Sequence, residues 1–413
     1  MAIFCCVYGL VALVAVGVTF VPVRREPFTI FCFFTAWCCG ELALQWAVLT
    51  AAVFGLGLAT GAFTSMVGAL GAAALVLTFV GLVVLWRAGV AATSAVRDGL
   101  ASAKGLRVDP ALLDRPQVTD RAWRRLLAVP VRPSSVQVDQ NLNYAGDASP
   151  RHRVDVYRSA EPAVGPRPVL VYIHGGAWIV GDKREQGKPM LYELAARGWV
   201  CISINYRLSP KATWPEHIVD CKRAIAWSRA HASTFGGDPN FLAVAGGSAG
   251  GHLAALCALS ANDPDFQPGF EDADTSVDAC VSLYGVLELT GDRSSSGRYG
   301  PGLRLTLERQ VFKAKLATDR ARFEAASPLH RIHAGAPPFL VLQGRNDTLV
   351  PVEVARQFVE RFSEATTAPI AEIELPLAQH AFDILASPRC SATTTGIVAF
   401  LETVRVQAAR PSP

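Results

Sequence analysis

A serine flanked by glycines stands between a strand-like and a helix-like segment. The stretch Gly246-Gly247-Ser248-Ala249-Gly250 follows the apolar β-type run 241–245 and precedes an apolar-periodic run over 253–259. Gly246-x-Ser248-x-Gly250 is the nucleophile-elbow pattern, which holds a serine on a strained strand-to-helix turn. Glycine is needed on either side because a side chain there would collide where strand and helix approach. The pattern also occurs by chance around a capping serine, so other groups must accompany it to indicate a nucleophile.

An acid and a base follow the serine in the order that this pattern requires. A serine hydroxyl needs a base to take its proton, and the base needs a third group to orient it. His380 is the only histidine beyond His333, and it follows the strand-like run 370–375. Asp347 directly follows the run 339–343. Although a turn aspartate and a loop histidine are the alternatives, their joint placement predicts Ser248 as nucleophile, Asp347 as acid and His380 as base.

A glycine-rich loop upstream is suited to stabilise a negatively charged oxygen. The segment His174-Gly175-Gly176-Ala177-Trp178 directly follows the apolar run 168–173. An oxyanion needs backbone N–H donors, each contributing about 3 kcal/mol of barrier lowering. The expected donors are amides of this loop and of the residue after the serine: Gly175, Gly176, Ala177 and Ala249. A tight turn between strand and helix is the alternative, and we expect His174 to be structural.

Strands and helices alternate from residue 136 onward. Strand-like runs are expected at 136–144, 152–157, 168–173, 200–206, 241–245, 279–284, 339–343 and 370–375. Helices are expected near 188–197, 214–231 and 392–406, besides the one after the serine. The first two strands are expected to pair at the sheet edge around a turn at 145–147. This alternation predicts an α/β fold with a parallel sheet covered on both faces, and all three candidate catalytic groups fall at the carboxyl ends of strands.

The N-terminal region is apolar enough to lie in a membrane. Residues 1–20 carry no formal charge, and Glu41 is the only formally charged residue between Phe28 and Trp86. A signal peptide is the alternative for residues 1–20, but its basic n-region is missing. We predict three transmembrane helices, near residues 1–20, 29–50 and 65–86, because each span needs about 20 residues. Glycines that allow close helix packing are Gly57, Gly61, Gly68 and Gly71.

The charged residues of the N-terminal region predict its orientation in the membrane. Arg24 and Arg25 follow the first predicted span and Arg87 follows the third, so with three spans these residues share one side. Basic residues favour the cytoplasmic side, which predicts an outside N-terminus and a cytoplasmic C-terminal domain in a multi-pass plasma-membrane protein. Two or four spans would invert this orientation. Glu41 is expected at an interface or bonded across helices, with a direct functional role as the alternative.

Composition argues against several classes of partner. The net charge of +4 is small and scattered without a basic stripe, so nucleic acid is not an expected partner. The ten cysteines lack metal-ligand spacing with histidines, and no disulfide framework is indicated. We therefore expect no metal and no cofactor. The sequence leaves the oligomeric state open.

Several segments together resemble a known enzyme family, the hormone-sensitive-lipase-like branch of the α/β-hydrolases, which includes membrane-associated mycobacterial esterases. The segments that carry the resemblance are 174–178, 205–208, 237–239, 246–251, Asp347 and His380. The resemblance covers residues 136–406 and implies the α/β-hydrolase fold, with a mostly parallel central sheet, and the triad Ser248, Asp347 and His380. The family's oxyanion loop is usually His-Gly-Gly-Gly. Its donating second and third glycines correspond to Gly176 and to Ala177, which keeps its N–H but restricts φ.

The sequence as a whole predicts a membrane-anchored serine carboxylesterase or lipase that acts on a lipophilic ester beside membrane lipids. Its expected parts are a membrane region (1–86), a juxtamembrane linker or cap (87–135) and the catalytic domain (136–413). We expect residues 291–323, with the linker, to form a lid. Alternatives on the same fold are an amidase, a formamidase or a prenylcysteine methylesterase. Alternatives of another class are a membrane scaffold with a disused hydrolase domain and a small transporter with a soluble appendage.

Overall fold

A computed structural model describes residues 1–24, 27–119, 127–162, 164–291 and 301–409. The described strands form one sheet of eight strands in the order β1-β2-β4-β3-β5-β6-β7-β8. In chain order they are β1 Val136–Asn143, β2 Arg153–Ser159, β3 Arg167–Ile173, β4 Val200–Ile204, β5 Gly237–Gly247, β6 Ala279–Leu283, β7 Phe339–Gly344 and β8 Ile370–Leu375. The β1 and β2 strands pair antiparallel, and β2 joins β4 antiparallel. From β4 to β8 every neighbouring pair is parallel, as the sequence predicted.

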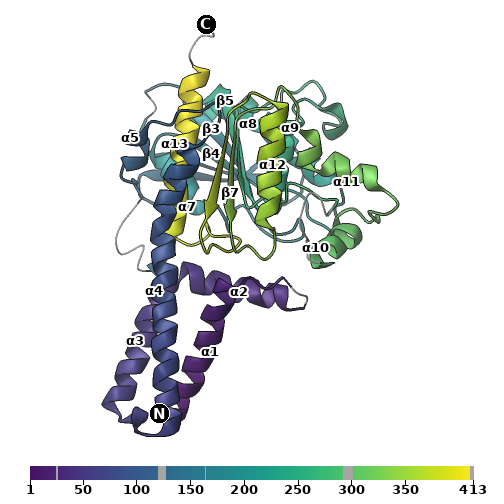
Figure 1. Cartoon of the computed structure of the whole chain (residues 1–413). Helices are drawn as coiled ribbons and strands as arrows, with labels where there is room; N and C mark the ends of the chain where they lie inside the picture. Colours follow the sequence, from purple (N-terminus) through teal and green to yellow (C-terminus); the bar gives the residue numbers. More distant parts are fainter. Residues whose placement is uncertain (25–26, 120–126, 163, 292–300, 410–413) are drawn as a thin grey trace.

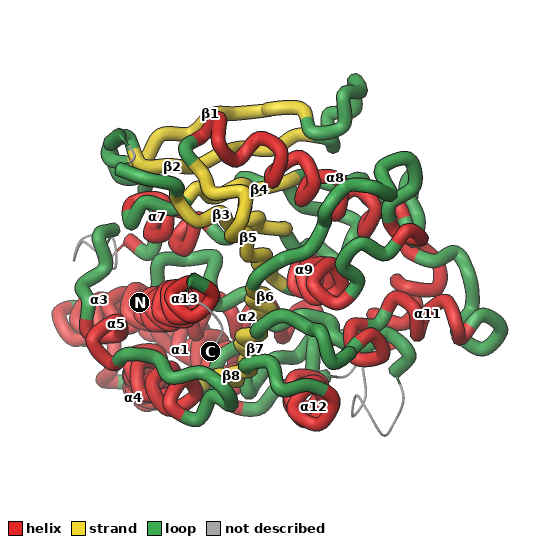
Figure 2. Tube along the Cα trace, turned by 90° about the horizontal axis from the view of Figure 1, so that it is seen from above, coloured by secondary structure: helices red, strands yellow, loops and turns green. Residues whose placement is uncertain are grey.

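Helices cover both faces of the sheet, which explains its continuous apolar strands. One face is covered by α7 Lys188–Ala196, α13 Pro388–Ala408 and the second half of α4 Met66–Ala101. The other is covered by α8 Glu216–His231, α9 Ala249–Leu259 and α12 Val352–Ala365. Figure 2 shows these two groups on opposite sides of the strands. Alternate residues of β3 enter the two cores: Val169 and Val171 face one group, and Leu170 and Tyr172 face the other.

Shorter helices complete the chain. They are α5 Pro110–Asp114, α10 Pro301–Thr306, α11 Arg320–Ala326, the 3-10 turns η1 Ala62–Thr64, η2 Ala232–Phe235, η3 Pro264–Phe266 and η5 Pro328–Arg331, and the π-helical turn η4 Leu307–Val311. The predicted lid segment 291–323 includes α10 and η4, but its residues 292–300 lie outside the described residues. Residues 120–126 of the predicted linker or cap also lie outside them. The sequence analysis did not identify α12.

The N-terminal region forms a helical bundle with one helix lying across its end. It comprises α1 Ala2–Phe20, α2 Phe28–Glu41, α3 Ala43–Ala59 and α4. Figure 1 shows α1, α3 and α4 side by side, projecting from the sheet domain, with α2 running across between bundle and domain. Among the described residues, α1 and α4 are long and apolar enough to cross a membrane, and the bent pair α2–α3 could supply a third span.

Two details differ from the predicted spans. The segment 29–50 is not one helix, because α2 and α3 meet at Leu42 with a bend of 82°. The third segment does not end at residue 86, since α4 continues to Ala101 and packs on the sheet edge. A Cβ on Gly99 would lie 2.4 Å from the Glu372 carbonyl oxygen, so helix and β8 are in close contact. The predicted linker therefore begins inside a helix that joins the bundle to the sheet.

Glycines pack the bundle as predicted at three of the four positions. A Cβ on Gly71 would lie 2.7 Å from the Cys6 nitrogen of α1, and one on Gly57 would lie 2.3 Å from the Phe63 ring. A Cβ on Gly68 would similarly meet backbone of the η1 turn. Gly61 instead has open space beside it and a φ of +65°, so its role is in the turn.

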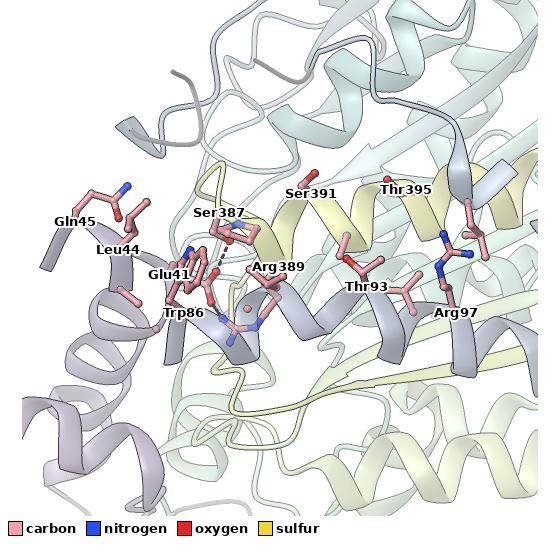
Figure 3. A pocket seen from close by; sticks show the side chains of 18 residues that line it. Glu41, Leu44, Gln45, Trp86, Thr93, Arg97, Ser387, Arg389, Ser391 and Thr395 are labelled. Atoms are coloured by element: carbon pink, nitrogen blue, oxygen red, sulfur yellow. Dashed lines mark hydrogen bonds and ion pairs between the residues drawn. The ribbon is translucent and has the colours of Figure 1, made fainter. Parts of the chain in front are cut away.

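The bend between α2 and α3 is bonded to the sheet domain through Glu41. This carboxylate forms a buried ion pair with Arg389 and accepts a hydrogen bond of 2.6 Å from Ser387 Oγ at the start of α13 (Figure 3). These bonds hold the end of α2 against the domain, whereas α3 turns away into the bundle. A cavity of about 480 Å³ lies beside the ion pair, between the bend, α4 and α13. Glu41 thus bonds across elements, the role that we expected for it.

Candidate active site

Ser248 lies on a sharp turn between β5 and α9. Its φ of 57° and ψ of −121° are unfavourable for a residue with a side chain, as expected for a strained elbow. A Cβ on Gly246 would lie 2.3 Å from the Gly250 oxygen, and one on Gly250 would lie 2.1 Å from the Ile173 oxygen. The two flanking glycines are therefore required by space, as the sequence predicted. The serine itself is partly exposed, so a substrate can reach it.

Asp347 and His380 are bonded to each other at the carboxyl ends of β7 and β8. His380 Nδ1 lies 2.7 Å from Asp347 Oδ2, and both side chains are buried. The Asp347 Oδ1 atom also accepts from the backbone N–H groups of Leu349 and Val350, each at 2.8 Å. Because the aspartate is fixed by these bonds, it orients the imidazole ring and favours the tautomer with hydrogen on Nδ1.

Two glutamines support this pair, and the sequence analysis missed both. Gln343 Nε2 donates to Asp347 Oδ2 at 2.8 Å. Gln379 Oε1 accepts from the backbone nitrogens of Thr348 at 2.7 Å and His380 at 2.9 Å. One side chain therefore ties the acid loop to the base loop. No pattern in the sequence marks either glutamine, and Gln379 is 31 positions from Thr348, so only the folded sheet brings these two residues together.

Tyr284, at the end of β6, lies between the elbow and the base. Its ring centroid is 4.5 Å from that of His380. A Cβ on Gly247 would lie 2.6 Å from its hydroxyl oxygen. The hydrogen bonds among described residues do not include one from Ser248 Oγ to His380. Catalytic hydrogen bonds are often long in proteins without substrate, so this arrangement is compatible with proton transfer once substrate is bound.

Among the described residues, the loop after β3 has two backbone N–H groups without an acceptor near the place expected for the oxyanion. The Gly175 N–H already donates to Gln186 Oε1 at 2.8 Å, so it is not free to bind an oxyanion, and this part of the prediction is wrong. In the described part of the chain, the N–H groups of Gly176, Ala177 and Ala249 have no hydrogen-bond acceptor. Ala177 adopts a φ of 52° despite its side chain.

His174 is held as a structural residue, as expected. Its Nδ1 atom lies 2.7 Å from the Gly175 oxygen, and its ring stacks on Tyr206 at 4.6 Å. Burial lowers the pKa of His174 to about 4, so it is neutral at physiological pH.

Comparisons with known proteins identify esterases. The model of the BD-FAE family matches residues 154–362, about half of the 413-residue chain. The probable carboxylic ester hydrolase LipM of Mycobacterium tuberculosis is 47% identical over 267 residues, which cover 64% of this chain and 61% of the relative. Esterase LipC of the same organism is 46% identical over 258 residues, covering 62% and 63%. The chain thus matches about three fifths of the length of these curated relatives.

Solved structures give the same fold. A thermophilic esterase from Thermogutta terrifontis, Est2, with butyrate bound, superposes with a TM-score of 0.53 and 25% identity, covering 68% of this chain and 97% of the esterase. A truncated carbohydrate esterase from gut microbiota superposes with a TM-score of 0.55 and 22% identity, covering 66% and 99%. The sheet domain therefore has the α/β-hydrolase fold, and the chain belongs to the BD-FAE family of hormone-sensitive-lipase-like α/β-hydrolases.

Proposed function

We propose that this protein is a membrane-anchored serine esterase that hydrolyses carboxylic esters. The observation that carries the proposal is the pairing of a strained, accessible Ser248 with an Asp347–His380 hydrogen bond of 2.7 Å at the same end of the sheet. The identity to mycobacterial relatives described as esterases supports the same activity. Neither a metal nor a cofactor takes part in the proposed steps.

The proposed reaction has two halves. His380 Nε2 takes the proton of the Ser248 hydroxyl while Oγ attacks the ester carbonyl, and Asp347 stabilises the imidazolium that forms. The amides of Gly176, Ala177 and Ala249 are positioned to donate to the oxyanion. His380 then gives its proton to the leaving alcohol, and the acyl group stays on Oγ. Water, deprotonated by His380, attacks the acyl-enzyme, and the carboxylic acid leaves as Oγ regains a proton.

Hydrolysis of chromogenic esters of graded acyl length tests this activity. The wild type is compared with Ser248→Ala and His380→Ala, and with Ser233→Ala. Ser233 is an exposed serine of η2, at the opposite end of β5 from the elbow. We expect the first two variants to lose about 10³-fold or more in kcat and the control to match the wild type. Full activity in Ser248→Ala would exclude the proposed mechanism.

A second candidate is a prenylcysteine methylesterase. An isoprenylcysteine alpha-carbonyl methylesterase of Arabidopsis thaliana is 29% identical over 255 residues, which cover 59% of this chain and 56% of the relative. The reaction is again ester hydrolysis, so the same residues would serve it. Comparing turnover of a prenylcysteine methyl ester, a simple acyl ester and the matched amide separates this candidate and the amidase alternative from a general esterase.

We infer further that α1, α3 and α4 cross the plasma membrane and that the sheet domain lies in the cytoplasm. The three helices run side by side along the bundle (Figure 1), and α3, with 17 residues, is at the lower limit for a span. Arg24 donates to the Asp347 carbonyl oxygen of the sheet domain, and Arg87 lies on α4 two residues before Gly89, where a Cβ would be 4.0 Å from Pro388 of α13. Both arginines are therefore near the sheet domain, and basic residues favour the cytoplasmic side. A reporter that is active only in the cytoplasm should be active when it is fused after Pro413. Activity of a reporter that works only outside the cytoplasm would contradict this orientation.

A further inference from the structure

Residues of the N-terminal region touch the loops that carry the proposed acid and base. Arg24 donates to the Asp347 carbonyl oxygen from Nε at 3.2 Å and Nη2 at 3.0 Å. Trp37 Nε1, on α2, donates at 2.9 Å to the carbonyl oxygen of Ala381, the residue after the base. These partners are 323 and 344 positions apart in the chain. The carboxyl end of the sheet, where α/β folds bind ligands, therefore faces the N-terminal helices.

An aromatic ring of α2 reaches the base itself. The Phe33 and His380 ring centroids are 6.1 Å apart, with the rings edge to face at 78°. Phe33 and Trp37 are one helical turn apart, so both lie on the α2 face that is turned to the catalytic loops. A substrate that binds beside His380 will therefore meet Phe33.

Other large side chains of α2 are apolar and exposed. They are 52–65% exposed and include three phenylalanines: Phe28, Ile30, Phe31 and Phe34. The described residues of α2 before Glu41 carry no charge that would favour contact with water. A cluster of large aromatic side chains facing outward on one helix is typical of a surface that contacts a membrane or a partner.

The geometry of the bundle favours the membrane as that contact. If α3 crosses the bilayer with α1 and α4, the bend of 82° directs α2 nearly along the bilayer surface. The bundle also exposes apolar side chains, including Val11 and Val14 of α1 and Val48 of α3. Phenylalanine-rich faces of helices that lie in the membrane plane bury among the acyl chains near the headgroups.

We propose that α2 lies in the membrane surface as the roof of the active site, so that Ser248 receives membrane-resident, long-chain acyl esters directly from the bilayer. Phe33 contacts the ester next to His380, and the exposed phenylalanines of α2 anchor the roof among lipid tails. This inference rests on the proposed esterase activity. It names the substrate class as water-insoluble acyl esters dissolved in the leaflet, rather than soluble short-chain esters.

The test uses the full chain reconstituted in phosphatidylcholine vesicles and two esters with the same fluorescent alcohol. One is an oleoyl ester that partitions into the vesicles, and the other is a water-soluble butyryl ester. The variants Phe31→Ser and Phe34→Ser change exposed phenylalanines of α2. The control Phe79→Ser changes a phenylalanine that is 40% exposed on α4, in the bundle.

We expect Phe31→Ser and Phe34→Ser to lose about tenfold or more in kcat/KM on the oleoyl ester. Their kcat/KM on the butyryl ester should stay within about twofold of the wild type, and the control Phe79→Ser should resemble the wild type on both esters. Unchanged butyryl turnover also reports that the variants fold. Phe33→Ala should lower the oleoyl-to-butyryl ratio of kcat/KM, because the acyl chain loses its contact.

Two results overturn the inference while leaving the esterase intact. One is an equal loss on both esters in Phe31→Ser and Phe34→Ser, and the other is an unchanged oleoyl-to-butyryl ratio in all α2 variants. Failure of the underlying activity gives a different result, because neither ester would then show turnover that depends on Ser248.

Discussion

Two buried carboxylates lie near His380, and their hydrogen bonds distinguish their roles. Asp347 bonds His380 Nδ1, whereas Asp383 accepts from the Tyr284 hydroxyl and does not bond the imidazole among the described contacts. Burial raises the pKa of Asp383 to about 6, and the hydrogen bond from Tyr284 offsets only part of this rise. The geometry therefore assigns the orienting role to Asp347, and Asp383 is the natural comparison.

We predict that Asp347→Asn lowers kcat on a soluble ester by about 10³–10⁴-fold. An amide at this position can donate to Nδ1 and so favours the tautomer that cannot accept the serine proton. The matched variant Asp383→Asn should stay within about tenfold of the wild type, since it leaves the Asp347–His380 bond in place. Steady-state kinetics at neutral pH measures both, and a larger loss in Asp383→Asn would contradict the assignment.

At the scale of residues, sequence order predicted Ser248, Asp347 and His380, because a nucleophile, an acid and a base must each follow a strand in a fixed order. The structure brings Asp347 and His380 into hydrogen-bond contact, and their catalytic roles with Ser248 stay a proposal. The amide of Gly175 was predicted as an oxyanion donor, but its N–H already donates to Gln186 Oε1, eleven residues away. Arg24 and Phe33 could not be found, because nothing in the sequence indicates which loop a distant helix will touch.

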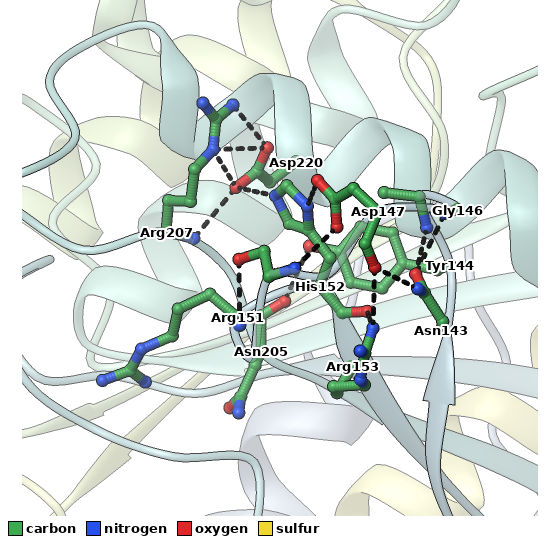
Figure 4. Close-up of polar contacts among 12 residues, drawn as sticks. Asn143, Tyr144, Gly146, Asp147, Arg151, His152, Arg153, Asn205, Arg207 and Asp220 are labelled. Carbon is green, nitrogen blue, oxygen red and sulfur yellow. Dashed lines mark hydrogen bonds and ion pairs between the residues drawn. The ribbon is translucent and has the colours of Figure 1, made fainter.

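Among the elements, the β1–β2 turn is tied to α8 by a histidine between two carboxylates (Figure 4). His152 Nδ1 lies 2.6 Å from Asp147 Oδ2, and Nε2 lies 3.1 Å from Asp220 Oδ2 as an ion-pair contact. Burial opposes the charged imidazolium, but the carboxylates of Asp220 and Asp147 outweigh it and raise the pKa of His152 above 6.5. The cluster therefore stabilises the fold most when His152 is protonated.

We expect this stabilisation to depend on pH in one direction. Because the folded-state pKa of His152 is raised, its contribution is fully present below the unfolded pKa of about 6.5 and is lost as pH rises through the folded value. The difference in unfolding temperature between wild type and His152→Gln should therefore be largest below pH 6.5 and shrink toward alkaline pH. His333→Gln, at an exposed histidine, serves as the control. A gap that widens as pH rises would contradict this account.

The helices and strands were largely predictable wherever a whole segment lies in a single environment, because that environment then determines the pattern of its apolar residues. All eight strands were expected, although β5 begins four residues earlier than the predicted run 241–245. Buried strands such as β3 and β4 were recognisable because they give short, continuous apolar runs. The segment 29–50 was predicted as one helix because hydropathy does not register a bend of 82°. Glu41, at the end of α2 beside the bend, bonds Ser387 and Arg389, which are more than 340 positions away in the chain and cannot be paired with it from hydropathy. The end of α4 was missed for a related reason, since its second half is buried against the sheet domain.

For the whole molecule, the Glu41–Arg389 pair joins the N-terminal helical region to the sheet domain. Both side chains are 1% exposed, so the loss of one partner leaves the other charge buried without compensation. We predict that Glu41→Leu destabilises the full chain by about 3–5 kcal/mol, measured as a lower unfolding temperature in detergent. The double variant Glu41→Leu with Arg389→Met should recover most of this loss. A double variant as unstable as the single one would show that the pair does not act as a unit.

The division of the chain into an apolar region and an α/β region follows from composition alone, and the structure adds how the two meet. The sheet domain is joined to the bundle by a helix and not by a linker, because α4 runs unbroken from the bundle onto the edge of the sheet. The active-site end of the sheet is turned toward α2, which hydropathy alone would assign to a membrane span. The proposed membrane-facing active site depends on this arrangement, and it could not be predicted from either region separately.

Covalent labelling of the full-length protein tests the central claim, that Ser248 is the activated nucleophile. A fluorophosphonate loses fluoride when a serine Oγ bonds its phosphorus, and peptide mass spectrometry locates the adduct. We predict one adduct on Ser248 in the wild type, none there in Ser248→Ala, and labelling at least about 10²-fold slower in His380→Ala. Labelling of another residue in place of Ser248, or undiminished labelling of Ser248→Ala, would contradict the account.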